Sequence, residues 1–438
     1  MVKLWTCASL LALATFVSAC SRDFILEGER FPLRAAFSDD AGEVPENRAL
    51  PISLPASASN SEWTHRLGAP SSRIAHPALG GNLQPVWSVP IGQGDGRRHR
   101  ITAEPVASGG LIYTLDSRAQ VTAVSNGGSV AWTRDLTPGF TRNADSASGG
   151  GMAIADGKLF VSSAFGMLWA LDLATGAEVW SKRFDAPLTA APTITGGTVY
   201  VVASDSTGWS LDASTGQTNW QLSGAPSPSS MVGGAAPAVS GEMVLFPTSA
   251  GELIAARRDT GQIMWRRAVA GTRIGVAYAS VTDVTGDPVV QGDVIYVGNQ
   301  SGRVMALNRS DGRPIWTADE AAYGPVWPVG GSVFLMSDRN QLVRLDASSG
   351  AFVWGTPLSL YTETRERRRA EIHPHYGPVL AGGRLIVGSG DGALRSFDPA
   401  SGALVAETEL RSGAAVAPIV VGGTLYVVSR DGQLTAYR

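Results

Sequence analysis

The sequence predicts an all-β fold, a closed β-propeller of eight blades with four antiparallel strands in each, from three observations. Glycine makes up 52 of the 438 residues, about 12% against a typical ~7%, which suits many tight turns between short strands. A phrase of 11 residues that ends in Trp recurs along the chain. The last repeat stops one strand short, and a lone strand of the missing kind precedes the first repeat.

The Trp phrase sets the length of the repeat. Successive tryptophans lie 45, 48, 40, 45, 51 and 38 residues apart, which is the length of a four-stranded propeller blade. We expect each indole to be buried at the outer part of a blade, against the neighbouring blade, as a packing device. The set is Trp87, Trp132, Trp180, Trp220, Trp265, Trp316 and Trp354, and in a further copy Ala406 stands near the Trp position.

Each repeat divides into four strands in a fixed order. A short first strand starts near Pro and ends in Gly, as in PTITGG at 192–197, because Pro lacks the donor that a strand interior needs. An apolar second strand follows, such as TVYVVAS at 198–204. A third strand leads into a Thr-Gly, Asp-Gly or Ser-Gly turn, and the Trp strand closes the unit.

The two ends of the array complete one blade. The chain stops at Arg438 after the third strand of the last repeat, and residues 82–91 carry the Trp87 strand with no three strands before it. Pairing the two pieces makes the eighth blade and leaves no open strand edge at the junction. The propeller is therefore placed at residues 81–438.

The amino-terminal residues predict an export signal and a lipid anchor. Residues 1–19 contain Lys3, an apolar run and small residues, as a secretory leader does. The sequence VSAC at 17–20 resembles the bacterial lipoprotein signal, which implies that Cys20 is acylated and becomes the first mature residue. By resemblance to the sorting pattern of such lipoproteins, Ser21 favours the outer membrane over the inner one.

The segment between the anchor and the propeller has no periodic pattern. Residues 20–80 begin with the acylated Cys20 and then mix Pro, Ser, Ala and charges without a sustained period. We therefore expect a flexible tether with little fixed structure.

The repeat and the leader together resemble a known family. The phrase A-x-D-x-x-T-G-x-x-x-W resembles the tryptophan-docking repeat of pyrroloquinoline-quinone-dependent dehydrogenases and their non-enzymatic relatives. Eight such repeats behind a lipoprotein leader resemble the family of outer-membrane protein assembly factor BamB, over residues 82–438. The resemblance implies a periplasmic lipoprotein of the outer membrane that belongs to the β-barrel assembly machinery. Its implied partners are the periplasmic domains of BamA, other subunits of the machinery and unfolded outer-membrane proteins.

The same resemblance implies a partner-binding surface on two adjacent loops between blades. In the family one loop carries Leu-x-Leu-Arg, and the matching Ser-Ser-Met-Val here keeps apolar character at Met231 and has Val232 in place of the Arg. The next loop carries two Asp residues in the family. Asp283 matches the first and Thr285 stands at the second. Arg273 of that loop is expected to replace the missing positive charge.

Residues that carry chemistry are sparse, so we assign no catalytic residue, metal or cofactor. The expected ring contains no Cys, and neither HExxH nor G-x-S-x-G occurs. By resemblance, the quinone enzymes use paired Cys residues, a calcium ion and an Asp base. A quinoprotein dehydrogenase and another propeller scaffold lipoprotein remain the alternatives. His373 and His375 are read as a solvated loop, with a metal pair as the lesser alternative.

Charge gives little guidance to a partner. The formal net charge of −3 provides no reason to expect nucleic acid. Residues 92–104 and 355–376 are rich in Arg, the latter with Glu interspersed. These loops are interpreted as solvated charged faces, or else as docking surfaces for an acidic partner or anionic head groups.

Overall fold

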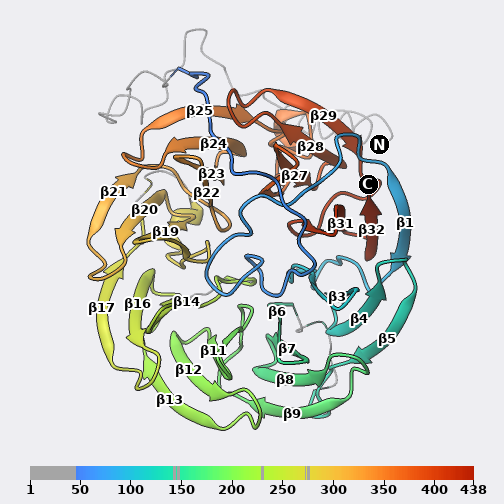
Figure 1. The fold of residues 1–438 in the computed structure, drawn as a ribbon, viewed down its shortest axis with the longest axis vertical. Helices are drawn as coiled ribbons and strands as arrows, with labels where there is room; N and C mark the ends of the chain where they lie inside the picture. Colours follow the sequence, from blue (N-terminus) through green and yellow to red (C-terminus); the bar gives the residue numbers. More distant parts are fainter. Residues whose placement is uncertain (1–45, 142–144, 146–147, 228–230, 272, 274–276) are drawn as a thin grey trace, which may run out of the picture. The chain divides into compact units, whose positions relative to one another are not determined.

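Eight four-stranded antiparallel sheets form a ring in the part of the chain that the computed structural model describes (Figure 1). The structure describes residues 46–141, 145, 148–227, 231–271, 273 and 277–438. The predicted number of blades and their strand order are confirmed. Cys20 and the leader lie outside the described residues.

The first four blades in the chain follow the predicted order from the innermost to the outermost strand. Their strands are β2 (Val106–Ser108), β3 (Leu111–Leu115), β4 (Gln120–Ser125) and β5 (Val130–Asp135); β6 (Gly150–Ala155), β7 (Lys158–Ser163), β8 (Met167–Asp172) and β9 (Glu178–Arg183); β10 (Thr193–Thr195), β11 (Thr198–Val202), β12 (Thr207–Asp212) and β13 (Thr218–Ser223); and β14 (Ala238–Ser240), β15 (Met243–Pro247), β16 (Glu252–Arg257) and β17 (Ile263–Ala268).

The remaining blades repeat this order, and the eighth takes its outermost strand from the start of the propeller. Their strands are β18 (Val289–Gln291), β19 (Val294–Asn299), β20 (Arg303–Asn308) and β21 (Pro314–Ala318); β22 (Trp327–Val329), β23 (Ser332–Met336), β24 (Gln341–Asp346) and β25 (Phe352–Pro357); β26 (His375–Ala381), β27 (Arg384–Ser389), β28 (Ala393–Phe397) and β29 (Leu404–Glu409); and β30 (Ile419–Val421), β31 (Thr424–Val428), β32 (Gln433–Tyr437) and β1 (Pro85–Pro90). Among the described residues, the short 3₁₀ helices η2 (Ala277–Ser280) and η3 (Glu366–Arg368) lie in connections between blades.

The ring closes as predicted, by pairing β1 with β32. Trp87 lies opposite Ala436, and the hydroxyls of Ser88 and Thr435 are 3.0 Å apart. Beyond the strands, the Gln84 N–H donates to the carbonyl of Arg438 at 2.8 Å. The two ends of the propeller are therefore joined by a regular antiparallel ladder.

A row of side chains across each sheet explains why the repeat carries Trp. In the second blade Phe160, Ala170 and Trp180 are register partners on β7, β8 and β9. The small Ala lets the rings of Phe160 and Trp180 approach to 5.9 Å between centroids. The indole then lies over Gly216 of the next blade, where an added Cβ would meet the ring at 2.7 Å.

The same contact joins seven pairs of neighbouring blades. The turn glycines beneath the indoles are Gly128, Gly176, Gly216, Gly261, Gly312, Gly350 and Gly402. Blade seven has Ala406 instead of Trp because the next blade has no turn between its third and fourth strands, the chain ends being joined there. Trp316 and Trp354 are buried as expected, but the other five indoles are half-buried, since the outermost strands border solvent.

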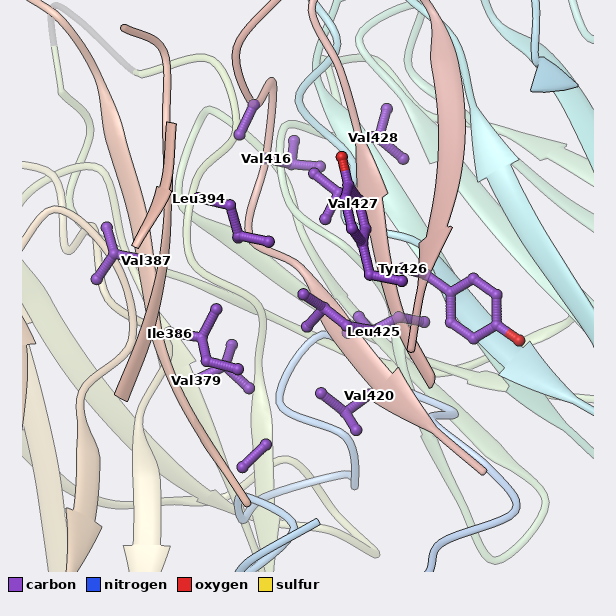
Figure 2. Close-up of a cluster of buried hydrophobic side chains, with 14 of the residues drawn as sticks. Val379, Ile386, Val387, Leu394, Val416, Val420, Leu425, Tyr426, Val427 and Val428 are labelled. Atoms are coloured by element: carbon purple, nitrogen blue, oxygen red, sulfur yellow. The ribbon is translucent and has the colours of Figure 1, made fainter. Parts of the chain in front are cut away.

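Aliphatic side chains fill the space between blades seven and eight, where no Trp is present. Figure 2 shows Ile386 and Leu394 of blade seven facing Val420, Leu425 and Val427 of blade eight. All five side chains are buried. This junction therefore depends on close aliphatic packing and on the strand pairing that closes the ring.

Part of the expected tether is instead packed on the propeller. Trp63 is only 1% exposed, and its N–H donates to the carbonyl of Ala107 at 2.8 Å. Further out, the Arg48 N–H donates to the carbonyl of Val353 at 2.8 Å. The expectation of a free segment is therefore wrong for residues 46–80, which cross the centre of the ring (Figure 1).

Candidate functional site

The two faces of the ring are built from different loops. Because the four strands of a blade alternate in direction, the turn after the first strand and the turn after the third lie on one face, which we call the hairpin face. The turn after the second strand and the connection to the next blade lie on the other, the connection face. The predicted partner-binding residues are in connections and therefore lie on the connection face.

The structure brings the two predicted loops together. The backbone N–H of Met231 donates to Oδ1 of Asp283 at 3.2 Å. Beside it, Val232 is 53% exposed, and an added Cβ on Gly149 would lie 3.7 Å from its Cγ1. We call residues 231–233 the apolar loop. It reaches from the connection before blade four to the connection before blade two.

Asp283 and Thr285 are internal rather than surface groups. Asp283 is 5% and Thr285 is 3% exposed. The Thr285 hydroxyl donates to the carbonyl of Ala322 at 2.6 Å, and Asn299 donates to the carbonyl of Asp283 at 3.1 Å. Burial raises the pKa of the Asp283 carboxyl. Asp283 therefore holds the apolar loop, and Thr285 ties its own connection to the next one.

Arg273 forms an internal ion pair. Its Nε lies 2.7 Å from Oδ2 of Asp338, and both side chains are largely buried. Its guanidinium also donates to the carbonyl of Asp319 at 3.1 Å. The charge of Arg273 therefore joins the connection before blade five to blade six, and the apolar loop is the part of the predicted set that faces solvent.

At the hub, an arginine of the amino-terminal segment crosses the central bore. Nε of Arg66 lies 2.9 Å from Glu104, and Nη1 lies 2.8 Å from Asp287 and donates to the carbonyl of Gly234 at 3.0 Å. Burial alone would lower the pKa of Arg66, but the two carboxylates more than offset it, so its pKa is raised. Sequence reasoning missed Arg66 because the segment shows no pattern that places it in the bore.

This arrangement does not fit a calcium-bound quinone on the axis. One oxygen each of Glu104 and Asp287 is already ion-paired with Arg66, and a divalent cation needs several free oxygen ligands. Within the described residues no group of three or more His, Cys, Asp or Glu side chains is placed to hold a metal ion. The same residues include no helix long and apolar enough to cross a membrane.

His375 is a structural residue. Its Nδ1 is 2.8 Å from the Ser389 hydroxyl and its Nε2 is 2.8 Å from the carbonyl of Ser359. Burial lowers the pKa of His375. Both ring nitrogens are therefore engaged within the protein, and His375 is part of β26 rather than of a solvated loop.

The longer Arg-rich loop forms a projecting hairpin. Tyr361 pairs with Ile372, and both are exposed. The Arg369 guanidinium lies 4.9 Å from the Tyr361 ring centroid and 3.7 Å from Glu366. The residues at its tip, 363–369, are exposed, so this loop is accessible to solvent and to a partner alike.

The propeller with docked tryptophans defines the class of the protein as a PQQ-like β-propeller. Among solved structures, BamB from Moraxella catarrhalis is similar with a TM-score of 0.67 and 23% identity, covering 82% of this chain and all of that one. Quinohemoprotein alcohol dehydrogenase from Comamonas testosteroni is similar with a TM-score of 0.64 and 16% identity, covering 87% and 81%. These likenesses show the fold, which enzymes and an assembly factor share.

Sequence comparison identifies the family. The model of the family described as "Outer membrane protein assembly factor BamB" matches residues 117–356 and 363–438. The chain belongs to this family. Its relatives include the BamB proteins of Shewanella oneidensis, 26% identical over 80% of this chain and 87% of that protein, and of Xanthomonas campestris, 28% identical over 81% and 85%.

Proposed function

We propose that the protein is a non-enzymatic lipoprotein subunit of the β-barrel assembly machinery, anchored to the periplasmic side of the outer membrane by acylated Cys20. The observation that carries this proposal is the family match over six blades and parts of blades one and eight. The paired carboxylates at the hub support a binding role rather than quinone chemistry. In this role the propeller binds the periplasmic domains of BamA.

The apolar loop on the connection face is the proposed contact with BamA. Val232 is exposed and apolar, whereas the buried Asp283 positions the loop by accepting a hydrogen bond from the Met231 N–H. A small apolar residue in a loop held by a buried carboxylate presents a fixed surface, which lowers the ordering cost of association. Arg273 and Thr285 support the same connections from inside.

A charge placed at Val232 tests this contact. We expect Val232→Glu to reduce the BamA that co-purifies with the tagged protein by at least about tenfold, because a buried unpaired charge opposes association. Val179→Glu is the matched control, since Val179 is similarly exposed on β9, far along the chain from the loop. Equal recovery of BamA with both variants would exclude the apolar loop as the contact with BamA.

The outermost strands are the proposed contact with unfolded clients. Exposed apolar side chains occur on these strands, among them Val86, Val130, Val179, Ile315 and Leu404. An extended client can add a strand to such an edge. We expect a photocrosslinker at Val179 to capture nascent barrel proteins. Crosslinks to BamA from the apolar loop, with none to clients from β9 or β1, would refute this part.

A further inference from the structure

The innermost strands of the blades present unpaired backbone groups to the hub. In each hairpin the residue beside the turn bonds to the second strand, so the next residue inward turns its N–H and C=O toward the axis. Ala107, Ile194 and Val290 hold this position in their blades. A ring of such edges requires partners, because buried backbone groups are almost always paired.

Residues 58–78, which we call the hub segment, supply these partners. Five equivalent N–H groups donate to it: Ala107 to the carbonyl of Trp63 (2.8 Å), Ile154 to that of Thr64 (2.8 Å), Ile194 to Nε2 of His65 (3.1 Å), Val239 to the carbonyl of Pro70 (3.4 Å) and Val290 to that of Ser71 (2.8 Å). The hub segment therefore follows the ring from blade one to blade five and pairs with one edge after another.

The hub segment forms different hydrogen bonds with blades six, seven and eight. Blade six has Pro328 at the equivalent position, which has no N–H to satisfy, and there Arg73 donates instead to the carbonyls of Pro325 and Val326. Blade seven donates from Gly382 to the carbonyl of Pro77, at 3.0 Å. In blade eight the carbonyl of Val420 accepts from Nδ2 of Asn60 at 2.7 Å.

Two side chains of the hub segment add recognition to this backbone pairing. Trp63 is buried at the inner end of blade one. Arg66 reaches the two carboxylates and the carbonyl of Gly234 in the bore. The contact thus combines edge pairing, an aromatic anchor and a paired charge, which are the elements of a peptide-binding site.

We propose that the hairpin-face mouth of the propeller is a binding site for an extended peptide, that its ligand is the chain's own hub segment, and that Trp63 and Arg66 determine recognition. The short link to β1 gives the segment an effective concentration on the order of millimolar, so the site is filled in cis. The same site accepts the hub segment in trans, from a peptide of that sequence.

A nicked form of the full protein tests this proposal. A protease site inserted between Gly81 and Asn82, which are both exposed, allows cleavage without removing any residue. We expect the amino-terminal fragment to stay bound to the body after cleavage, and an excess of fluorescent peptide 58–78 to replace it. Loss of the fragment from a body whose circular dichroism spectrum stays unchanged would overturn the proposal. Unfolding of the body on cleavage would overturn it as well.

Peptide variants measure recognition while the body stays unchanged. We expect the peptide with Arg66→Glu to exchange in with an affinity at least about 100-fold weaker, because a buried ion pair becomes a cluster of like charges. The peptide with Ser72→Ala is the control, since the hydrogen bonds of this part of the hub segment are made by Ser71 and Arg73. Equal affinity of the Arg66→Glu and unchanged peptides would contradict the assignment of Arg66.

Hydrogen exchange in the intact chain gives an independent readout. We expect Arg66→Glu to speed exchange of the Ala107, Ile154 and Ile194 amides at least about tenfold, because local opening becomes easier. Arg313→Glu, at an exposed turn, should leave these amides unchanged. Unchanged protection in a folded Arg66→Glu protein would contradict the proposal.

Discussion

The indole of Trp180 and the turn glycine Gly216 form one contact in which each residue restricts the other. Gly216 has φ of +73°, a region that costs a side-chain-bearing residue about 1–2 kcal/mol. The indole lies over its Cα, and the Trp180 Nε1–H donates to the carbonyl of Ala213 at 3.1 Å. The backbone conformation of Gly216 in blade three and the packing of Trp180 in blade two are therefore coupled.

A double-mutant cycle measures this coupling. We expect Trp180→Ala to lower the free energy of unfolding by about 2–4 kcal/mol, because the indole is half-buried. Gly216→Ala should cost about 2–3 kcal/mol, from strain and from overlap with the indole. In the Trp180→Ala background Gly216→Ala should cost only about 1 kcal/mol. Urea unfolding gives each value, and additive effects would contradict docking.

His65 makes stability depend on pH. Burial lowers its pKa from 6.5 to about 4, so the unfolded chain binds a proton more readily than the folded protein. This contribution is complete above pH 6.5 and is lost as pH falls toward 4. At pH 5 the loss is about 2 kcal/mol. The free energy of unfolding, measured with urea, should therefore be lower at pH 5 than at pH 7. We expect His65→Gln, which keeps an acceptor for the Ile194 N–H, to remove about 2 kcal/mol of this difference. An unchanged difference would contradict the burial of His65.

At the scale of the element, pairing of β1 with β32 holds the first and last parts of the propeller together. The hydroxyls of Ser88 and Thr435 face each other at 3.0 Å across the ladder. This pairing encloses nearly the whole propeller in one loop. A covalent bond at this place therefore constrains the unfolded chain strongly.

A disulfide between these strands tests the closure. We expect Ser88→Cys with Thr435→Cys, in a chain with Cys20→Ser, to oxidise readily and to raise the free energy of unfolding by about 2–4 kcal/mol. The same protein in reductant is the control. Two cysteines that stay reduced under mild oxidation would show that β1 and β32 are not adjacent.

Strands and blades were predictable from the sequence because their information is local. The alternation of apolar runs, Pro at strand starts and Gly in turns recurs in every repeat, and the missing strand at Arg438 identified its partner around Trp87. Even the exception at Ala406 has a structural cause. The hub segment was not predictable, because it binds by carbonyls and single side chains such as Arg66 that obey no period.

The adjacency of the two proposed loops was predictable, but the exposure of their side chains was not. The loops of Met231 and Asp283 are adjacent, as the resemblance implied. The burial of Asp283 and Thr285 and the ion pair of Arg273 with Asp338 depend on how connections pack across blades. Such packing between distant segments cannot be predicted from the sequence of a single loop.

At the scale of the whole molecule, the packing of residues 46–80 on the propeller shortens the link to the proposed anchor. Because residues 46–80 are bound to the propeller, only residues 21–45 separate Cys20 from the body, an extended length of about 80–90 Å. A free segment up to residue 80 would reach more than twice as far.

Removal of the anchor tests the location. We expect Cys20→Ala to move the protein from the membrane fraction to the soluble periplasmic fraction and to abolish palmitate labelling, since acyl chains supply the membrane affinity. Cys7→Ala, in the leader, is the matched control and should leave both unchanged. Membrane retention and labelling of the Cys20→Ala protein would refute acylation at this residue.

Affinity purification of the tagged full-length protein from its own membranes in mild detergent, with partners identified by mass spectrometry, tests the central claim most directly. We expect BamA and other subunits of the barrel assembly machinery to be enriched, and Val232→Glu to deplete them. A purified protein without BamA, or one that reduces a dye with alcohol after addition of quinone and calcium, would contradict the account.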